Sequence, residues 1–179
     1  PFNKPFVAGK ELYYIAQAVT MGNLSGDGYF TKKCAGLMQE RFGVKKILMT
    51  PSCTAALEMA AQLCDVGPGD EVIMPCFTFV ASFEAILMLG ATPILVEVDD
   101  TLTLDIEAVQ AAITPKTKAI MCVHMCGSMA NLDALKQVCD SHHLFLIEDA
   151  CQAIGGTYNG KALGTIGDLG CFSFDFVKG

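Results

Sequence analysis

The sequence lacks any large basic cluster, any apolar run of membrane-spanning length and any regular spacing of cysteines. It has 12 Lys and Arg residues against 19 Asp and Glu, and no basic group is larger than a pair. A net charge of −7 argues against a nucleic-acid surface, so any anionic ligand must be held by local donors. The longest apolar tract, residues 85–96, is broken by Gly90, Thr92 and Pro93. It is far shorter than the roughly 20 residues of a membrane helix.

Common phosphate-binding and hydrolase motifs are also missing. The sequence contains no GxxxxGK(S/T) loop and no GxSxG elbow, which removes the simplest nucleotide-triphosphatase and hydrolase interpretations. A glycine-rich segment at residues 22–28 precedes any strong strand. It therefore does not fit the GxGxxG loop that joins a strand to a helix in dinucleotide-binding domains, and we interpret it as a connector.

Nine cysteines are scattered through the sequence. This odd count without a framework favours buried thiols in a reducing cytoplasm over disulfides, so we expect a cytoplasmic protein. Cys122, His124 and Cys126 alternate on an expected strand and would share one face. The outer two would lie roughly 13 Å apart along that strand, too far for one zinc ion, which favours core packing over a metal site.

Apolar runs alternate with helical patterns along the sequence. Strands are expected at residues 46–50, 71–74, 93–98, 118–124 and 144–147 and from Gly170, with helices at 10–19, 29–42, 55–64, 80–89, 105–113 and 131–141. This alternation is typical of an α/β protein with a parallel sheet and right-handed crossovers. No repeat or linker interrupts it, so we expect residues 1–179 to form one domain.

The segment from Leu144 to Lys178 carries the most informative polar residues. Its first apolar run ends in Glu148 and Asp149, and a second short strand delivers Ser173 and then Lys178. Ligands of α/β proteins bind at the carboxyl edge of the parallel sheet. An acid and a lysine at two strand ends are therefore expected to face each other across one crevice.

Five segments, in this order, resemble the DegT/DnrJ/EryC1/StrS family of pyridoxal-phosphate-dependent, fold-type I sugar aminotransferases. They are residues 51–57 (PSCTAAL), 67–72 (GPGDEV), 75–79 (PCFTF), 148–153 (EDACQA) and 167–174 (GDLGCFSF). The resemblance implies a three-layer αβα fold around a mostly parallel sheet, with residues 1–179 as the cofactor-binding large domain. Because the sequence starts at Pro1 and stops one residue after Lys178, we expect a longer protein. A small C-terminal domain and a second subunit, as a homodimer, would complete the site.

The resemblance also implies roles for single residues around pyridoxal 5′-phosphate. Lys178 corresponds to the lysine that forms a Schiff base with the cofactor aldehyde and then carries a proton between substrate and cofactor. Asp149 corresponds to the carboxylate that keeps the pyridine nitrogen protonated. The other positions are Gln152 near the ring hydroxyl, Phe79 (preferred to Phe77) on the ring face, and Cys53, Thr54 and Ser173 around the phosphate. Position 53 is commonly glycine in the family, so Cys53 is a departure from its pattern.

The implied reaction moves an amino group from an amino acid, commonly glutamate in the family, to a nucleotide-linked keto-sugar. Related sugar dehydratases carry histidine in place of the lysine, so Lys178 favours transamination. Two other hypotheses stay open. A non-catalytic, regulatory member of the fold would take up no cofactor, and a generic nucleotide-binding α/β domain would bind NAD or ATP.

Overall fold

The computed structural model describes residues 7–175, so Lys178 lies outside the described residues. The described chain forms two compact units, one containing residues 7–50 and the other Pro51–Phe174. Whether residues 1–179 act as one cofactor-binding domain therefore stays a prediction. Within the described part, no helix is both long enough and apolar enough to cross a membrane.

The first unit contains two helices, α1 (Glu11–Thr20) and α2 (Tyr29–Phe42), as the sequence predicted to within one residue. The rings of Tyr14 and Phe30 meet edge to face with their centroids 5.6 Å apart.

The strand predicted at residues 46–50 is wrong, since the structure has no regular element there. An extended segment becomes a strand only where another strand pairs with it, and none of the described strands pairs with these residues.

The second unit is built on a five-stranded sheet in the order β2-β1-β3-β4-β7, and every neighbouring pair is parallel. The strands are β1 (Glu71–Pro75), β2 (Thr92–Val96), β3 (Thr117–Val123), β4 (Phe145–Asp149) and β7 (Leu169–Cys171). This confirms the expected parallel α/β sheet. A small antiparallel hairpin, β5 (Thr157–Tyr158) and β6 (Lys161–Ala162), was not predicted.

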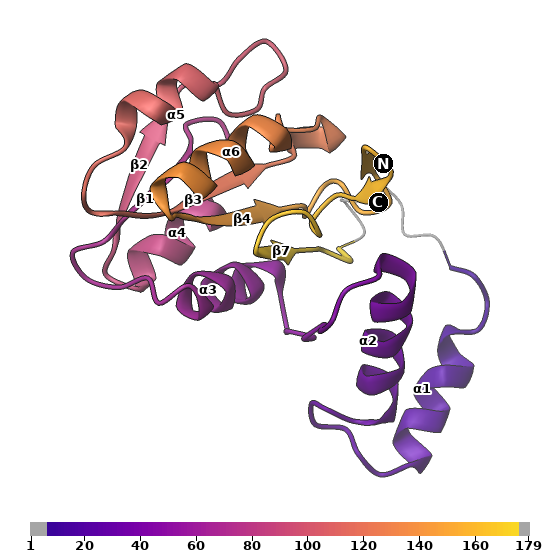
Figure 1. Ribbon diagram of the computed structural model, residues 1–179. Coiled ribbons are helices and arrows are strands. Elements are labelled where there is room, and N and C mark those ends of the chain that lie inside the picture. Colours follow the sequence, from indigo (N-terminus) through magenta and orange to yellow (C-terminus); the bar gives the residue numbers. More distant parts are fainter. Residues whose placement is uncertain (1–6, 176–179) are drawn as a thin grey trace. The chain divides into compact units, whose positions relative to one another are not determined.

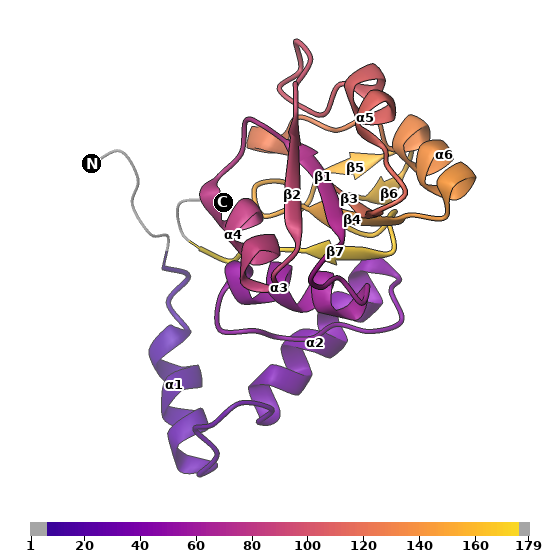
Figure 2. The same cartoon turned by 90° about the vertical axis from the view of Figure 1, so that its left-hand side faces the viewer.

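Helices cover both faces of this sheet and give the expected three layers, as Figure 1 and Figure 2 show. Helices α3 (Cys53–Leu63) and α4 (Val80–Met88) cover one face, and α5 (Ile106–Ala112) and α6 (Leu132–His142) cover the other. Alternate strand residues point to opposite faces. Ile147 of β4 accordingly packs with the α3 and α4 side, whereas its neighbour Leu146 packs with the α5 and α6 side.

Three glycines, two in the loop before β7 and one within β7, allow close packing of backbone segments at this edge of the sheet. A Cβ atom at Gly170 would overlap the backbone carbonyl of Gly164, and one at Gly167 would lie 2.6 Å from the carbonyl oxygen of Leu146. Gly164 itself has a φ of +81° and lies against the ring of Phe172. The GDLG motif therefore reflects a close backbone approach rather than flexibility.

Replacing Gly170 with alanine is expected to destabilise the protein by about 1–3 kcal/mol, because the added methyl group must push two backbone segments apart. Thermal or urea unfolding measures the change. Gly36→Ala serves as the control, since Gly36 lies within helix α2 and an added methyl group would meet no atom within 4 Å. It should change stability by less than about 1 kcal/mol, in the stabilising direction. Equal effects of the two substitutions would contradict the close-packing explanation.

Candidate functional site

The carboxyl ends of three neighbouring strands surround one small cavity. The strand order reverses between β1 and β3, which is where parallel α/β sheets bind ligands. The cavity measures about 20 Å³ and is lined by residues that follow or end β1, β3 and β4: Thr78, Phe79, Val123, Met125, Asp149, Cys151 and Gln152. Three of the predicted site residues, Phe79, Asp149 and Gln152, thus meet at this edge.

Asp149 ends strand β4 and is buried, with 5% of its surface exposed. Its Oδ2 accepts a hydrogen bond of 2.8 Å from Ser82 of α4, and its Oδ1 accepts one of 3.2 Å from the backbone N–H of Cys151. The hydroxyl of Ser82 is itself 3.0 Å from that of Thr78. These contacts fix the carboxylate at the edge of the cavity, where a buried negative charge favours a cationic partner.

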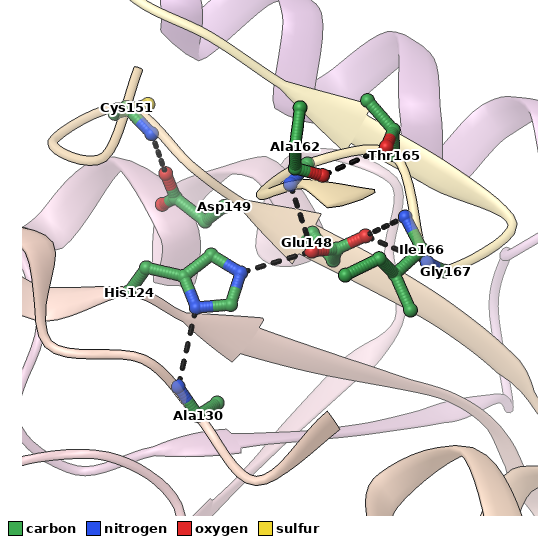
Figure 3. Close-up of polar contacts among 10 residues, drawn as sticks. His124, Ala130, Glu148, Asp149, Cys151, Ala162, Thr165, Ile166 and Gly167 are labelled. Atoms are coloured by element: carbon green, nitrogen blue, oxygen red, sulfur yellow. Dashed lines mark hydrogen bonds and ion pairs between the residues drawn. The ribbon is translucent and has the colours of Figure 1, made fainter. Parts of the chain in front are cut away.

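The neighbouring Glu148 points to the other face of the sheet and is fully buried (Figure 3). Its carboxylate accepts four hydrogen bonds: one of 3.0 Å from His124 Nε2, and others from the backbone N–H groups of Gly164 (2.8 Å), Ile166 (2.6 Å) and Gly167 (2.6 Å). Burial raises the pKa of Glu148, but these donors together outweigh burial and leave the pKa below its ordinary value. Glu148 therefore anchors the loop before β7 to strand β4.

His124 follows β3 and donates to Glu148 from Nε2, while its Nδ1 accepts a hydrogen bond of 3.3 Å from the backbone N–H of Ala130. Because a backbone N–H donates to Nδ1, this contact assigns the hydrogen on the Glu148 side of the ring to Nε2. The expectation that Cys122, His124 and Cys126 share one strand face is wrong. Cys126 lies in the 3₁₀ turn η1 (Met125–Gly127) with a φ of 50° and is exposed, because the strand ends at Val123.

Helix α3 begins two residues earlier than the sequence predicted, at Cys53. The side chain of Ser52 caps it by accepting a hydrogen bond of 3.1 Å from the N–H of Ala55. Cys53 and Thr54 therefore lie in the first turn, where unpaired N–H groups and the helix dipole favour an anion. Ser173 is buried two residues beyond β7, whose Cys171 pairs with Asp149 in the sheet.

The sequence favoured buried thiols over disulfides, and this expectation is wrong for one pair of cysteines. Cys53 and Cys151 form a disulfide, although 98 positions separate them in sequence. Cys34, Cys76 and Cys126 are exposed, while Cys64, Cys122, Cys139 and Cys171 are free and buried. The two disulfide sulfurs and a carboxylate oxygen of Asp149 all lie within 4.8 Å of one another. Because a metal binds thiolates, the disulfide form does not offer these sulfurs as metal ligands.

Two aromatic side chains stand exposed where β1 leads into α4. Phe79 is 61% exposed and occupies the N-cap position of α4, and Phe77 is 50% exposed. Of the two, Phe79 lines the cavity. Gln152 also lines it, and its Oε1 accepts a hydrogen bond of 2.8 Å from the N–H of Cys126. That contact assigns the orientation of the amide, with its oxygen toward Cys126. The NH₂ group of Gln152 then points the other way and can donate a hydrogen bond to a ligand.

Comparisons with known proteins agree on one family. The sequence model of the DegT/DnrJ/EryC1/StrS aminotransferase family matches residues 7–179. GDP-perosamine synthase from Caulobacter vibrioides is 39% identical over 171 residues, which are 95% of this chain and 46% of that protein. UDP-N-acetyl-3-dehydro-alpha-D-glucosamine 3-aminotransferase from Acidithiobacillus ferrooxidans is 49% identical over 124 residues, 69% of this chain and 34% of that protein.

A solved structure is similar over nearly the whole chain. It is a protein from Streptococcus pneumoniae classed as a sugar aminotransferase and solved in its PMP form. The TM-score is 0.95 at 32% identity, covering 99% of this chain and 49% of that one. The same protein has also been solved in its PLP form. This chain spans about half the length of the curated relatives it matches, or less.

Proposed function

The chain belongs to the DegT/DnrJ/EryC1/StrS aminotransferase family, and on this premise we propose that the full-length protein is a pyridoxal-phosphate-dependent sugar aminotransferase. The proposed reaction takes an amino group from an amino acid, with glutamate as the expected donor, to a nucleotide-linked keto-sugar. The observation that carries the proposal is the buried, hydrogen-bonded Asp149 beside the first turn of α3 at one sheet edge. These groups suit the two charged ends of this cofactor.

The residues present fit pyridoxal phosphate. The first turn of α3 offers N–H groups and the hydroxyl of Thr54 to a phosphate, and Ser173 follows the adjacent strand. Asp149 offers a fixed carboxylate to a protonated ring nitrogen. The amide NH₂ of Gln152 is the donor end that a ring oxygen would need. Phe79 offers an exposed aromatic face against which a flat ring can stack.

When bound, pyridoxal phosphate would accept the electron pair left when the α proton of the amino acid departs. The chain's own contribution is to hold the ring and move that proton. Asp149 would hold a proton on the ring nitrogen, which would make the ring a better electron acceptor. Lys178, outside the described residues, is proposed to attach the cofactor covalently and then to accept and return the proton.

The full protein is proposed to act as a homodimer whose subunits share their active sites. Helix α1 has no buried residue and exposes Leu12, Tyr13, Ile15 and Val19. Exposed apolar patches commonly mark protein interaction surfaces. The nucleotide-sugar and the amino acid donor are the small-molecule partners in this proposal.

The decisive assay supplies the full-length protein with pyridoxal phosphate, glutamate and a panel of nucleotide-linked keto-sugars. Release of 2-oxoglutarate together with formation of an aminated sugar nucleotide would support the proposal and identify the substrate. Cofactor uptake without release of 2-oxoglutarate from glutamate, or of the corresponding 2-oxo acid from any other amino acid tried as donor, would overturn the aminotransferase assignment. No cofactor uptake by folded protein would favour a regulatory role instead.

Replacing Phe79 with alanine is expected to weaken pyridoxal-phosphate binding by roughly tenfold, because a stacked aromatic pair is worth about 0.5–1.5 kcal/mol beyond its buried area. Titration followed by cofactor absorbance measures the dissociation constant. Phe77→Ala is the matched control, two residues earlier and also exposed but not lining the cavity. A larger loss from Phe77→Ala than from Phe79→Ala would contradict the assignment of the stacking residue.

A further inference from the structure

The disulfide between Cys53 and Cys151 joins the two elements that the proposed cofactor site requires. Cys53 is the first residue of α3, and Cys151 follows the strand-end carboxylate Asp149 by two residues. Their Cα atoms are 6.9 Å apart. That spacing is slightly above the usual range of about 4.4–6.8 Å and just below the roughly 7 Å beyond which a disulfide requires the backbone to move.

The bridge lies beside the carboxylate that the cofactor ring would have to reach, and Cys151 lines the cavity there. Both sulfurs are within 4.8 Å of a carboxylate oxygen of Asp149. A ring nitrogen hydrogen-bonded to that carboxylate would need to lie about 2.7–3.2 Å from it, and its ring atoms about 3.5–4.0 Å from any sulfur. The cavity beside Asp149 holds about 20 Å³, room for about one water molecule, whereas ligand pockets measure roughly 300–1,000 Å³.

We propose that Cys53 and Cys151 form a redox-modification site that controls cofactor loading. The disulfide form closes the space beside Asp149 to pyridoxal phosphate, and the dithiol form admits it. The inference rests on the proposed function, because it takes Asp149 and the first turn of α3 as the cofactor-binding groups. Nothing in the family motif requires a cysteine at position 53.

The oxidant is a hydroperoxide such as hydrogen peroxide. One cysteine, as its thiolate, attacks a peroxide oxygen, giving a sulfenic acid and, after proton transfer, one water. The second thiol then attacks the sulfenic sulfur, forms the S–S bond and releases the second water. Two thiols thus lose two electrons and two protons, and the peroxide becomes two waters. A dithiol reductant reverses the change by two exchange steps and is itself oxidised to a disulfide.

The Cys53–Cys151 pair differs from the buried cysteines in the expected reactivity of its thiols. Burial raises the pKa of Cys64, Cys139 and Cys171 to about 12, so these thiols ionise little at neutral pH and react slowly. Cys53 lies instead at a helix N-terminus, where the dipole stabilises a negative charge. The exposed Cys34, Cys76 and Cys126 are free in the structure.

The test uses full-length protein stripped of cofactor, with a metal chelator present throughout. One portion is treated with hydrogen peroxide and another with dithiothreitol, and both are freed of reagent. Peptide mass mapping then locates the disulfide, and absorbance titration measures uptake of pyridoxal phosphate. Oxidised protein should carry the Cys53–Cys151 cross-link and bind the cofactor at least about tenfold more weakly than reduced protein. Dithiothreitol should restore uptake, and preloading with cofactor should lower the equilibrium fraction of cross-linked protein, since coupling between two sites is reciprocal.

Two variants separate this switch from general oxidation. Cys151→Ser keeps the backbone N–H that bonds to Asp149 but cannot be bridged, so its uptake should be the same after peroxide and after dithiothreitol. Cys76→Ser, at an exposed position on the same sheet edge, should keep the full difference between the two treatments.

Equal uptake by oxidised and reduced wild-type protein would overturn the switch and leave the proposed function intact. A peroxide-induced cross-link that joins other cysteines, with Cys53 and Cys151 still free, would also overturn it. No uptake by folded protein in either state would overturn the proposed function, and the switch with it.

Discussion

Asp149→Asn should lower kcat of the full-length protein on the order of 100- to 1,000-fold, the scale for removing one preorganised electrostatic group from an active site. The carboxylate is expected to keep the ring nitrogen protonated, and a neutral amide cannot do so. The substitution preserves shape. The amide oxygen can still accept from the N–H of Cys151, while the amide NH₂ group donates to the hydroxyl of Ser82, which can act as an acceptor. The loss should therefore appear in turnover more than in folding.

The matched control is Ser82→Ala, which removes the hydrogen bond onto Asp149 Oδ2 but keeps the charge. Its loss of kcat should be smaller than that of Asp149→Asn, because the charge stays and one hydrogen bond to a charged group is worth about 1.5–3 kcal/mol, which sets a ceiling of roughly 10- to 150-fold. Steady-state kinetics with a saturating donor, together with thermal unfolding of both variants, measures the two effects. An Asp149→Asn protein that folds and retains a third of wild-type turnover would contradict the role given to Asp149.

Glu148→Gln should destabilise the fold by about 3 kcal/mol or more, although only one oxygen is exchanged for an NH₂ group. Two donors converge on each carboxylate oxygen: Ile166 and Gly167 on Oε1, and His124 and Gly164 on Oε2. In either orientation of the glutamine amide, its NH₂ group therefore faces two N–H donors in the core and cannot accept a hydrogen bond from them. The midpoint of urea unfolding measures the loss.

Glu84→Gln, at an exposed position on α4, is the control and should change stability by less than about 0.5 kcal/mol. The pH dependence gives an independent check. The folded-state pKa of Glu148 lies below its ordinary value of 4.5, so its stabilisation is complete above that pH and is lost as the pH falls through the folded pKa. The stability gap between wild type and Glu148→Gln should therefore narrow below pH 4.5. A gap that stays constant from neutral to acid pH would contradict the charged-anchor role.

The sequence predicted the parallel sheet and the position of Asp149 at its ligand-binding edge, because the signals for both are local. Apolar runs between helical patterns mark buried parallel strands, and helices α3 to α6 and strands β1 to β4 lie within two residues of their expected bounds. A charge directly after such a run, as at Asp149, marks a strand end at the ligand-binding edge. The strand at residues 46–50 failed because pairing depends on a partner that the local pattern does not contain.

Other features of the site depend on contacts between distant residues. Glu148 is adjacent to Asp149 and so must face the opposite, helix-covered side of the sheet. This alternation was a usable signal that Glu148 needs buried donors, and His124 at the end of the neighbouring strand was one candidate. The Asn159-Gly160 dipeptide was likewise a recognisable hairpin turn, and the structure gives the two residues φ values of 49° and 79°. The pairing of Cys53 with Cys151 left no local trace, because it spans 98 positions.

The central claim is that Lys178 and Asp149 hold opposite parts of one cofactor, and borohydride reduction tests it most directly. Full-length protein, kept reduced with dithiothreitol, is loaded with pyridoxal phosphate, treated with borohydride, digested and mapped by mass spectrometry. The account predicts a phosphopyridoxyl group on Lys178, and a loading spectrum altered by Asp149→Asn. Folded protein that carries the label on another lysine, or on none, would contradict it.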